Sequence, residues 1–89
     1  MNGIIKHIEL IERIDQLIRL QATGTPLELA SKLGVSKTKL YRIIRTMKLL
    51  NAPIEYNIAL QSFVYAQAVG FEFGFFAKDS STKNVKSLA

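Results

Sequence analysis

One stretch decides the fold of this chain: Gly34-Val35-Ser36-Lys37-Thr38-Lys39-Leu40-Tyr41-Arg42-Ile43-Ile44-Arg45-Thr46-Met47-Lys48. On a helical wheel, at about 100° per residue, its side chains divide into two arcs. The polar arc contains Lys37, Thr38, Tyr41, Arg42, Arg45 and Lys48, with Lys39 at its edge. The apolar arc contains Leu40, Ile43, Ile44 and Met47 and continues to Leu50. Two separate arcs predict a helix over residues 37–48 that packs one side on a core and presents a basic side outward.

The beginning of this helix is unfavourable for an isolated helix. Ser36 suits the N-cap position, because its hydroxyl can accept a hydrogen bond from an unpaired N–H of the first turn. Lys37 and Lys39 then follow, although the partial positive charge at a helix N-terminus favours acidic side chains. Cations at this end indicate that an anionic partner lies in front of them. A basic face that contacts only solvent is the alternative interpretation.

Composition limits the possible classes of protein. The chain has 89 residues, 48% of them hydrophobic, so we expect one folded domain with a modest core. It has no cysteine and one histidine, His7, which excludes disulfides, thiolate metal sites and cysteine nucleophiles. Because no signal-peptide or membrane-spanning run is visible, we expect a cytoplasmic protein with no membrane partner. Because His7 alone cannot form a metal site, we also expect no metal, and we expect no other cofactor. We expect no enzymatic activity, because no catalytic constellation stands out.

The positive charge is concentrated in one part of the chain. The formal net charge is +5. Between Leu29 and Ile54 there is no acidic residue, and the basic residues there are Lys32, Lys37, Lys39, Arg42, Arg45 and Lys48. The rest of the chain is therefore nearly neutral. An excess confined to one helix and the residues before it is the pattern of a surface that binds an anionic polymer.

A first helix is predicted over residues 4–22. Its apolar stripe contains Leu10, Ile11, Ile14, Leu17 and Ile18. The opposite, solvent-facing side contains Glu9, Glu12, Arg13, Asp15, Gln16 and Arg19. Thr23-Gly24 is expected to end this helix, with Gly24 in the left-handed conformation.

A short second helix is predicted over residues 26–33. Thr25 suits its N-cap, Pro26 its first position, and Glu28 completes a capping box with Thr25. Gly34 then provides the turn into the basic helix. Two helices joined by a brief turn that contains glycine form the helix-turn-helix arrangement.

The residues after Leu50 favour β structure. Asn51 can adopt the left-handed conformation and Pro53 prevents the helix from continuing. Residues 54–56 and 62–65 carry β-favouring side chains and predict a hairpin. Alternation over residues 71–76 favours a third strand. We predict one domain over residues 1–76, followed by a polar C-terminal tail over 77–89.

The motif spacing carries a family resemblance. The residues at helix-turn-helix spacing are Ala30, Leu33, Gly34, Val35, Leu40, Ile43 and Ile44. Together with the runs 29–36, 40–44 and 52–55, they resemble the winged-helix domain of DeoR-type and WYL-type bacterial transcriptional regulators, over about Ile8 to Tyr65. The resemblance implies an α+β, mainly helical fold: a three-helix winged helix-turn-helix with a β-hairpin wing at residues 54–65. It also implies DNA binding in transcription regulation.

This chain departs from the family pattern at two positions, in length, and in its aromatic C-terminal stretch, which has no counterpart in the family. Thr38 stands where the family usually has arginine, and Ile43 where it has an acidic residue, so base preference does not carry over. The chain has no room for the ligand-sensing domain of the larger regulators. No small-molecule effector is therefore expected.

The leading hypothesis is sequence-specific binding to double-stranded DNA, with the helix over residues 37–48 in the major groove. The residues assigned to base edges or nearby phosphates are Lys37, Thr38, Tyr41 and Arg42. The residues assigned to phosphates are Arg45, Lys48, Lys39 and Lys32, with the cap hydroxyls of Ser36 and Thr25. Tyr41 has a second interpretation, closing the edge of the core, and a lysine at position 48 is favourable at a helix C-terminus in any case.

The alternative hypothesis is a protein-interaction or dimerisation module that does not bind DNA directly. The apolar residues that would form its surface, or the contact of a homodimer, are Ile4, Ile5, Ile8, Phe71, Phe73 and Phe75. The contact would lie on the N-terminal helix or on the aromatic strand. Packing of the isoleucines under C-terminal strands is the other interpretation of their position.

Overall fold

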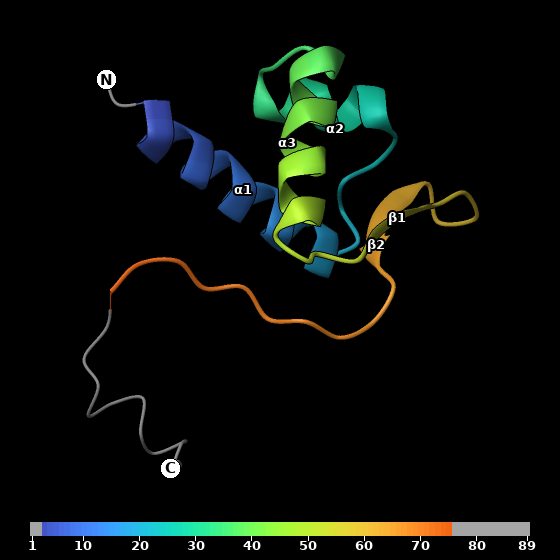
Figure 1. Ribbon diagram of the computed structural model, residues 1–89. Helices are drawn as coiled ribbons and strands as arrows, with labels where there is room; N and C mark the ends of the chain where they lie inside the picture. Colours follow the sequence, from blue (N-terminus) through green and yellow to red (C-terminus); the bar gives the residue numbers. More distant parts are fainter. Residues whose placement is uncertain (1–2, 76–89) are drawn as a thin grey trace.

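The computed structural model describes residues 3–75. Its elements are α1 (Gly3–Arg19), α2 (Pro26–Leu33), α3 (Lys37–Leu49), β1 (Ile54–Asn57) and β2 (Ser62–Tyr65) (Figure 1). The strands pair antiparallel in one two-stranded sheet, in a register that places Ile54 opposite Tyr65. The described chain is therefore α+β and mainly helical, as predicted. The predicted tail over residues 77–89 lies outside the described residues.

One apolar core joins the three helices to the hairpin. Its buried side chains are Ile11, Ile14, Ile18, Leu29, Ala30, Leu40, Ile43, Ile44, Met47, Ile54 and Phe63. The rings of Tyr56 and Phe63 meet edge to face across the strands, with centroids 5.0 Å apart. The apolar stripes predicted for α1 and α3 are thus the sides that pack. Leu50 is an exception: it is 65% exposed, because α3 ends before it and the chain turns away.

Local chemistry sets both ends of α2. The Thr25 hydroxyl accepts a hydrogen bond from the backbone N–H of Glu28 at 3.2 Å, and the Glu28 carboxylate accepts one from the Thr25 N–H at 2.8 Å. This is the predicted capping box, with Pro26 in the first helical turn. Gly34 ends the helix at φ 70°, and the N–H of Val35 closes the turn on α2. The chain then enters α3 after two residues.

The end of α1 differs from the prediction of a helix that reaches residue 22 and stops at Gly24. The helix ends at Arg19, and Gln21 adopts the left-handed conformation directly after it, at φ 53°. Gly24 is left-handed as predicted, at φ 72°, but it lies beyond the end of the helix. The N–H groups of Gln21 and Ala22 donate back to the last turn of the helix at 3.0 and 2.9 Å. This paired closure satisfies backbone carbonyls without glycine. It also directs Thr23 into the interior, where its side chain is completely buried.

A buried hydroxyl pair ties this link to the hairpin. The Thr23 hydroxyl accepts a hydrogen bond from the backbone N–H of Phe63 at 2.8 Å and lies 3.0 Å from the hydroxyl of Ser62. Thr23 and Ser62 are both at least 99% buried. Since buried polar groups require partners, the two hydroxyls fix where β2 docks against the α1–α2 link.

A second tie joins α1 to β2. Asp15 accepts hydrogen bonds from the Arg19 guanidinium at 3.0 Å and from the Tyr65 hydroxyl at 2.7 Å. The guanidinium also lies over the Tyr65 ring, 5.2 Å from its centroid. Burial, and then the hydrogen bond to Asp15, raise the pKa of Tyr65 above its ordinary value of 10.0. The prediction that Asp15 faces solvent is wrong, because Tyr65 covers its carboxylate.

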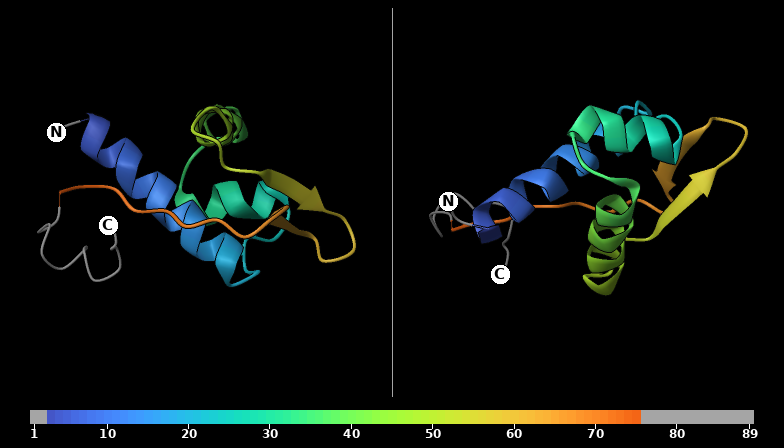
Figure 2. Two further views of the ribbon diagram at one scale, coloured as in Figure 1. Left: turned by 60° about the horizontal axis from the view of Figure 1, so that its bottom comes forward. Right: turned by 90° about the horizontal axis from the view of Figure 1, so that it is seen from above.

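The third strand predicted over residues 71–76 is not present in the described part, residues 71–75. After β2 the N–H of Ala66 donates to the carbonyl of Pro53 at 2.7 Å, and the chain then runs back past α1 in the opposite direction (Figures 1 and 2). Phe76, which the prediction included, lies outside the described residues. Alternating side chains therefore do not form a strand here, because no neighbouring strand pairs with this segment.

Candidate nucleic-acid interface

The helix α3 lies at the margin of the molecule. In the left view of Figure 2 it is seen nearly end-on, with α1, α2 and the hairpin all on one side of it. Its apolar side packs against α1, α2 and β1, so its other side faces solvent. The predicted interface residues on this outward side, all exposed, are Lys37, Thr38, Lys39, Tyr41, Arg42, Arg45 and Lys48. They share one side because they recur at intervals of three and four residues.

The middle of this side is a shallow depression of about 300 Å³. Its lining residues are Thr38, Tyr41, Arg42 and Arg45. Two guanidinium groups, a hydroxyl and a phenol therefore converge along about two turns of helix. Guanidinium groups offer paired donors to planar acceptors such as phosphates and the guanine edge, and the hydroxyl groups both donate and accept.

A second depression, of about 290 Å³, lies between α3 and the hairpin. Its lining residues are Pro26, Tyr41, Lys48, Ile54, Glu55, Tyr56 and Phe63. Tyr41 lines both depressions and is 48% exposed. Tyr41 therefore borders both the outward side of α3 and the depression beside β1, and its two interpretations stay open.

Within the part of the chain that the structure describes, no acidic side chain pairs with the cations on α3. Among residues 3–75 the one ion pair joins Arg19 to Asp15, far from this helix in the sequence. Lys37, Lys39, Arg42, Arg45 and Lys48 have no carboxylate partner within the described residues. On a surface of mixed charge, these cations would alternate with acidic side chains. On α3 they are grouped together with no acidic side chain among them.

The N-terminus of α3 adds to this positive surface. The Ser36 hydroxyl accepts a hydrogen bond from the backbone N–H of Lys39 at 3.1 Å, as expected for an N-cap. The first turn contains no acidic residue. The helix dipole and the two lysines therefore place positive charge at the same end of the helix.

Two of the predicted interface residues, Thr25 and Lys32, belong to α2 and have structural partners. The Thr25 hydroxyl holds the capping box described above. The Lys32 ammonium group donates to the backbone carbonyl of Ala22 at 2.5 Å. This contact fixes the α1–α2 link, so Lys32 has a structural role that the sequence did not indicate. Its ammonium group retains two further donors.

The tip of the hairpin is apolar. Ile58 and Leu60 are exposed there, Ile58 by 81%. The Asn57 side chain holds the turn by accepting a hydrogen bond from the N–H of Leu60 at 2.9 Å. No lysine or arginine occurs between Lys48 and Lys78, and this gap in the sequence was the available signal that the hairpin lacks cations.

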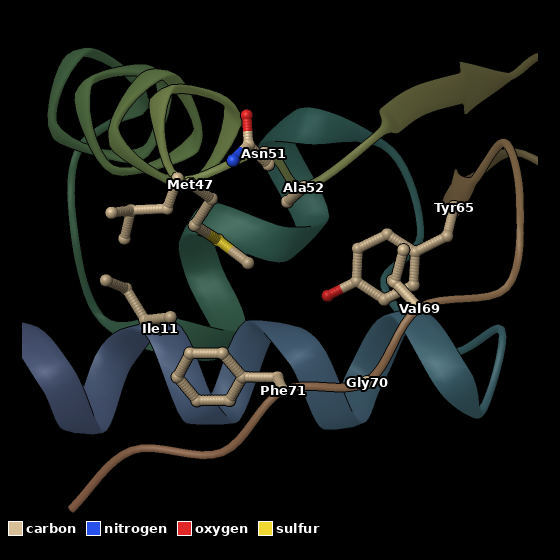
Figure 3. Close-up of a pocket in the computed structure, with 9 residues that line it drawn as sticks. Ile11, Met47, Asn51, Ala52, Tyr65, Val69, Gly70 and Phe71 are labelled. Carbon is tan, nitrogen blue, oxygen red and sulfur yellow. The ribbon is translucent and has the colours of Figure 1, made fainter.

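The residues of the predicted dimer contact differ in their exposure. Ile4, Ile5, Phe73 and Phe75 are exposed, and Ile8 is partly covered. Ile4 and Ile5 are 67% and 52% exposed, so within the described residues they do not pack under strands. Phe71 instead lines a cavity of about 300 Å³ together with Ile11 and Met47 (Figure 3).

Comparisons of the chain with models of protein families, with curated protein sequences and with solved structures gave no match. Of the helices within residues 3–75, none has both the length and the apolar character needed to cross a bilayer. Over the same residues, no three acidic, histidine or cysteine side chains are grouped so that they could hold a metal ion.

Proposed function

We propose that this chain is a winged helix-turn-helix domain that binds double-stranded DNA in a sequence-specific way and regulates transcription. In this proposal α2, the Gly34 turn and α3 form the helix-turn-helix, and β1 and β2 form the wing. The recognition helix α3 lies in the major groove. The observation that carries the proposal is the set of cations on the outward side of α3 that have no carboxylate partner in residues 3–75.

The dimensions and chemistry of α3 suit the major groove. That groove is about 12 Å wide, and an α-helix with its side chains is about 10–12 Å across. Arg42 and Arg45 line the central depression, where each could donate two hydrogen bonds to O6 and N7 of a guanine or to a phosphate. Thr38 and Tyr41 lie beside them and offer hydroxyl groups and apolar surface to neighbouring base edges.

The ends of the helix would contact the two phosphate backbones. Lys37 and Lys39 lie at the N-terminus, where the helix dipole also favours an anion. Lys48 lies in the last turn and lines the depression next to the hairpin. Because the hairpin has no cation, the electrostatic part of binding would come from α3, with Lys32 as the nearest addition.

The test compares the salt dependence of DNA binding for the wild type, Arg42→Ala and Arg13→Ala. A labelled duplex is first selected from a random pool and then titrated at several salt concentrations. A plot of the logarithm of the binding constant against the logarithm of the salt concentration should have a slope of about −4 to −5. Each neutralised phosphate contributes about −0.9, and α3 carries five cations. Arg42→Ala should weaken binding about 5- to 150-fold, as for loss of one bidentate contact. Arg13→Ala is the matched control, because Arg13 is exposed on α1 and its loss removes the same charge.

Two results would contradict the proposal. The first is an affinity that does not change with salt, and the second is an equal effect of the two arginine substitutions. If the wild type selects no duplex from the random pool, the result would instead favour the second candidate, a protein-interaction module. The observation that favours that candidate is the exposed apolar surface of Ile58 and Leu60 at the hairpin tip and of Phe73 and Phe75 in the C-terminal segment.

A further inference from the structure

The backbone of the segment over residues 69–73 is unpaired. After β2, the last backbone hydrogen bond within residues 3–75 runs from the N–H of Ala66 to the carbonyl of Pro53. Within residues 3–75, no backbone N–H or carbonyl from residue 67 to residue 75 forms a backbone hydrogen bond. The segment is nevertheless placed against the body, and Figure 1 shows no part of the described chain on its side away from α1. An extended segment whose backbone N–H and carbonyl groups are unpaired is a template for pairing with another strand.

The segment also has a sequence suited to a strand with one face covered. Val69 and Phe71 line the cavity next to Ile11 and Met47, so these alternate side chains face the body (Figure 3). Phe73 continues the alternation and is 61% exposed. The positions between them are Gly70 and Glu72. The period of two is that of a β-strand, yet residues 3–75 provide no partner strand.

We infer that residues 69–73 form an intermolecular antiparallel β-ribbon with the same segment of a second copy of this chain, centred on Phe71. In this register the two Phe71 residues lie opposite each other, and Val69 of each copy lies opposite Phe73 of the other. Glu72 of each copy lies opposite Gly70 of the second copy, so the two carboxylates do not meet directly. The register is therefore self-complementary, as a two-fold contact must be.

Neighbouring registers are less favourable. A register centred on Glu72 would place the two carboxylates opposite each other, and like charges in directly opposed positions are destabilising. A register centred on Phe73 would require pairing through Gly74, whose φ of 122° lies outside the β region. The Phe71 register also brings Phe73 under cover, and an aromatic side chain buries about 150–250 Å². This ribbon would explain why residues 69–73 alternate like a β-strand although they pair with no strand within residues 3–75.

The test measures the oligomeric state of the full chain by sedimentation equilibrium, without DNA. The wild type should approach twice the chain mass of 10.0 kDa between about 1 and 500 µM. Gly70→Glu places a carboxylate opposite Glu72 of the second copy at two symmetric positions and should weaken the dimer at least about tenfold. The double variant Gly70→Glu/Glu72→Lys places opposite charges at the same positions and should restore dimerisation.

The substitution at residue 70 should not disturb the fold of the single chain. A Cβ atom at Gly70 would meet nothing within 4 Å, and circular dichroism of each variant checks that the helices remain. A wild type that stays monomeric over the whole range would overturn the inference. A dimer that Gly70→Glu leaves intact, or that the double variant does not restore, would overturn it as well. Because no DNA is present, these outcomes are independent of the proposed function.

Discussion

At the scale of single residues, one buried hydroxyl connects two parts of the chain. The Thr23 hydroxyl accepts from the Phe63 N–H, lies beside the Ser62 hydroxyl, and is 2.9 Å from the carbonyl of Gly24. Its removal would leave the buried Phe63 N–H without this acceptor, while the Ser62 hydroxyl would still donate to the Phe63 carbonyl. The cost of such groups exceeds the net gain from the hydrogen bonds themselves, because they lose their hydration on folding.

We expect Thr23→Val to lower the free energy of unfolding by about 1–3 kcal/mol. Valine keeps the shape of threonine, so the loss reports the hydroxyl and not a cavity. Thr46→Val is the matched control: the Thr46 hydroxyl donates to the Arg42 carbonyl within α3 and is not buried, so its loss should change stability by about 0.5 kcal/mol or less. Urea unfolding of both variants measures the difference. Equal effects would show that the buried position of Thr23 does not matter.

The Tyr65 hydroxyl should make stability fall at high pH. Its pKa in the folded protein is raised above 10.0 by burial and by its hydrogen bond to Asp15, while in the unfolded chain it ionises near the ordinary value. The folded state therefore holds the proton more tightly, and its advantage is complete below about pH 10 and lost as the pH rises further. Tyr65→Phe should cost about 1–2 kcal/mol at pH 7 through loss of the Asp15 hydrogen bond.

The measurement for Tyr65 is the free energy of unfolding as a function of pH. Between about pH 9 and pH 11 the curve of the wild type should fall more steeply than that of Tyr65→Phe, because phenylalanine has no proton to lose. The other two tyrosines, Tyr41 and Tyr56, remain in both proteins, so the difference between the curves isolates residue 65. Parallel curves would contradict the expectation.

At the scale of elements, α2 is the helix whose ends depend most on local residues. Its capping box approaches Gly24 so closely that a Cβ atom there would collide with the Glu28 carboxylate and lie 3.0 Å from the Glu28 Cβ. Gly24 also has a φ of 72°. Two separate constraints therefore act on one residue at the start of α2.

Gly24→Ala should thus be more destabilising than Gly34→Ala. Gly34 has a similar φ of 70°, but a Cβ atom there would meet nothing within 4 Å, so its substitution reports backbone strain alone, about 1–2 kcal/mol. Gly24→Ala should cost about 1 kcal/mol more, since Glu28 must leave the capping box. Thermal unfolding of the two variants gives the comparison. A smaller effect at residue 24 would mean that the Glu28 side chain moves aside without loss.

Prediction from the sequence succeeded where neighbouring residues determine an element. Thr25, Pro26 and Glu28 lie within four residues of one another, and the start of α2 follows from them. The predicted end of α1 was wrong because Gln21 adopts the left-handed conformation three residues before Gly24. Glutamine has no intrinsic preference for this conformation, and the turn there directs Thr23 into the interior. The strand expected over residues 71–76 was wrong because a strand requires a partner, and alternation within one segment does not supply it.

At the scale of the whole molecule, the candidate site was accessible to sequence reasoning because it lies on one helix. Helical periodicity alone separated the outward side chains of α3, such as Arg42, from the buried ones, such as Ile43. Contacts between distant segments were not accessible in this way. The burial of Asp15 depends on Tyr65, fifty residues later, and no local pattern indicates that pairing.

The hydrogen bond between Thr23 and Phe63 has a consequence for the order in which the chain folds. It joins residues 40 positions apart, and closing a loop of that length costs about 3 kcal/mol of chain entropy. The contacts between α2 and α3 close much shorter loops and can form earlier. During synthesis from the N-terminus the helical part can therefore assemble while the hairpin is still incomplete. The docking of β2 then completes the domain, and only at that step does the Thr23 hydroxyl accept its hydrogen bond from the Phe63 N–H.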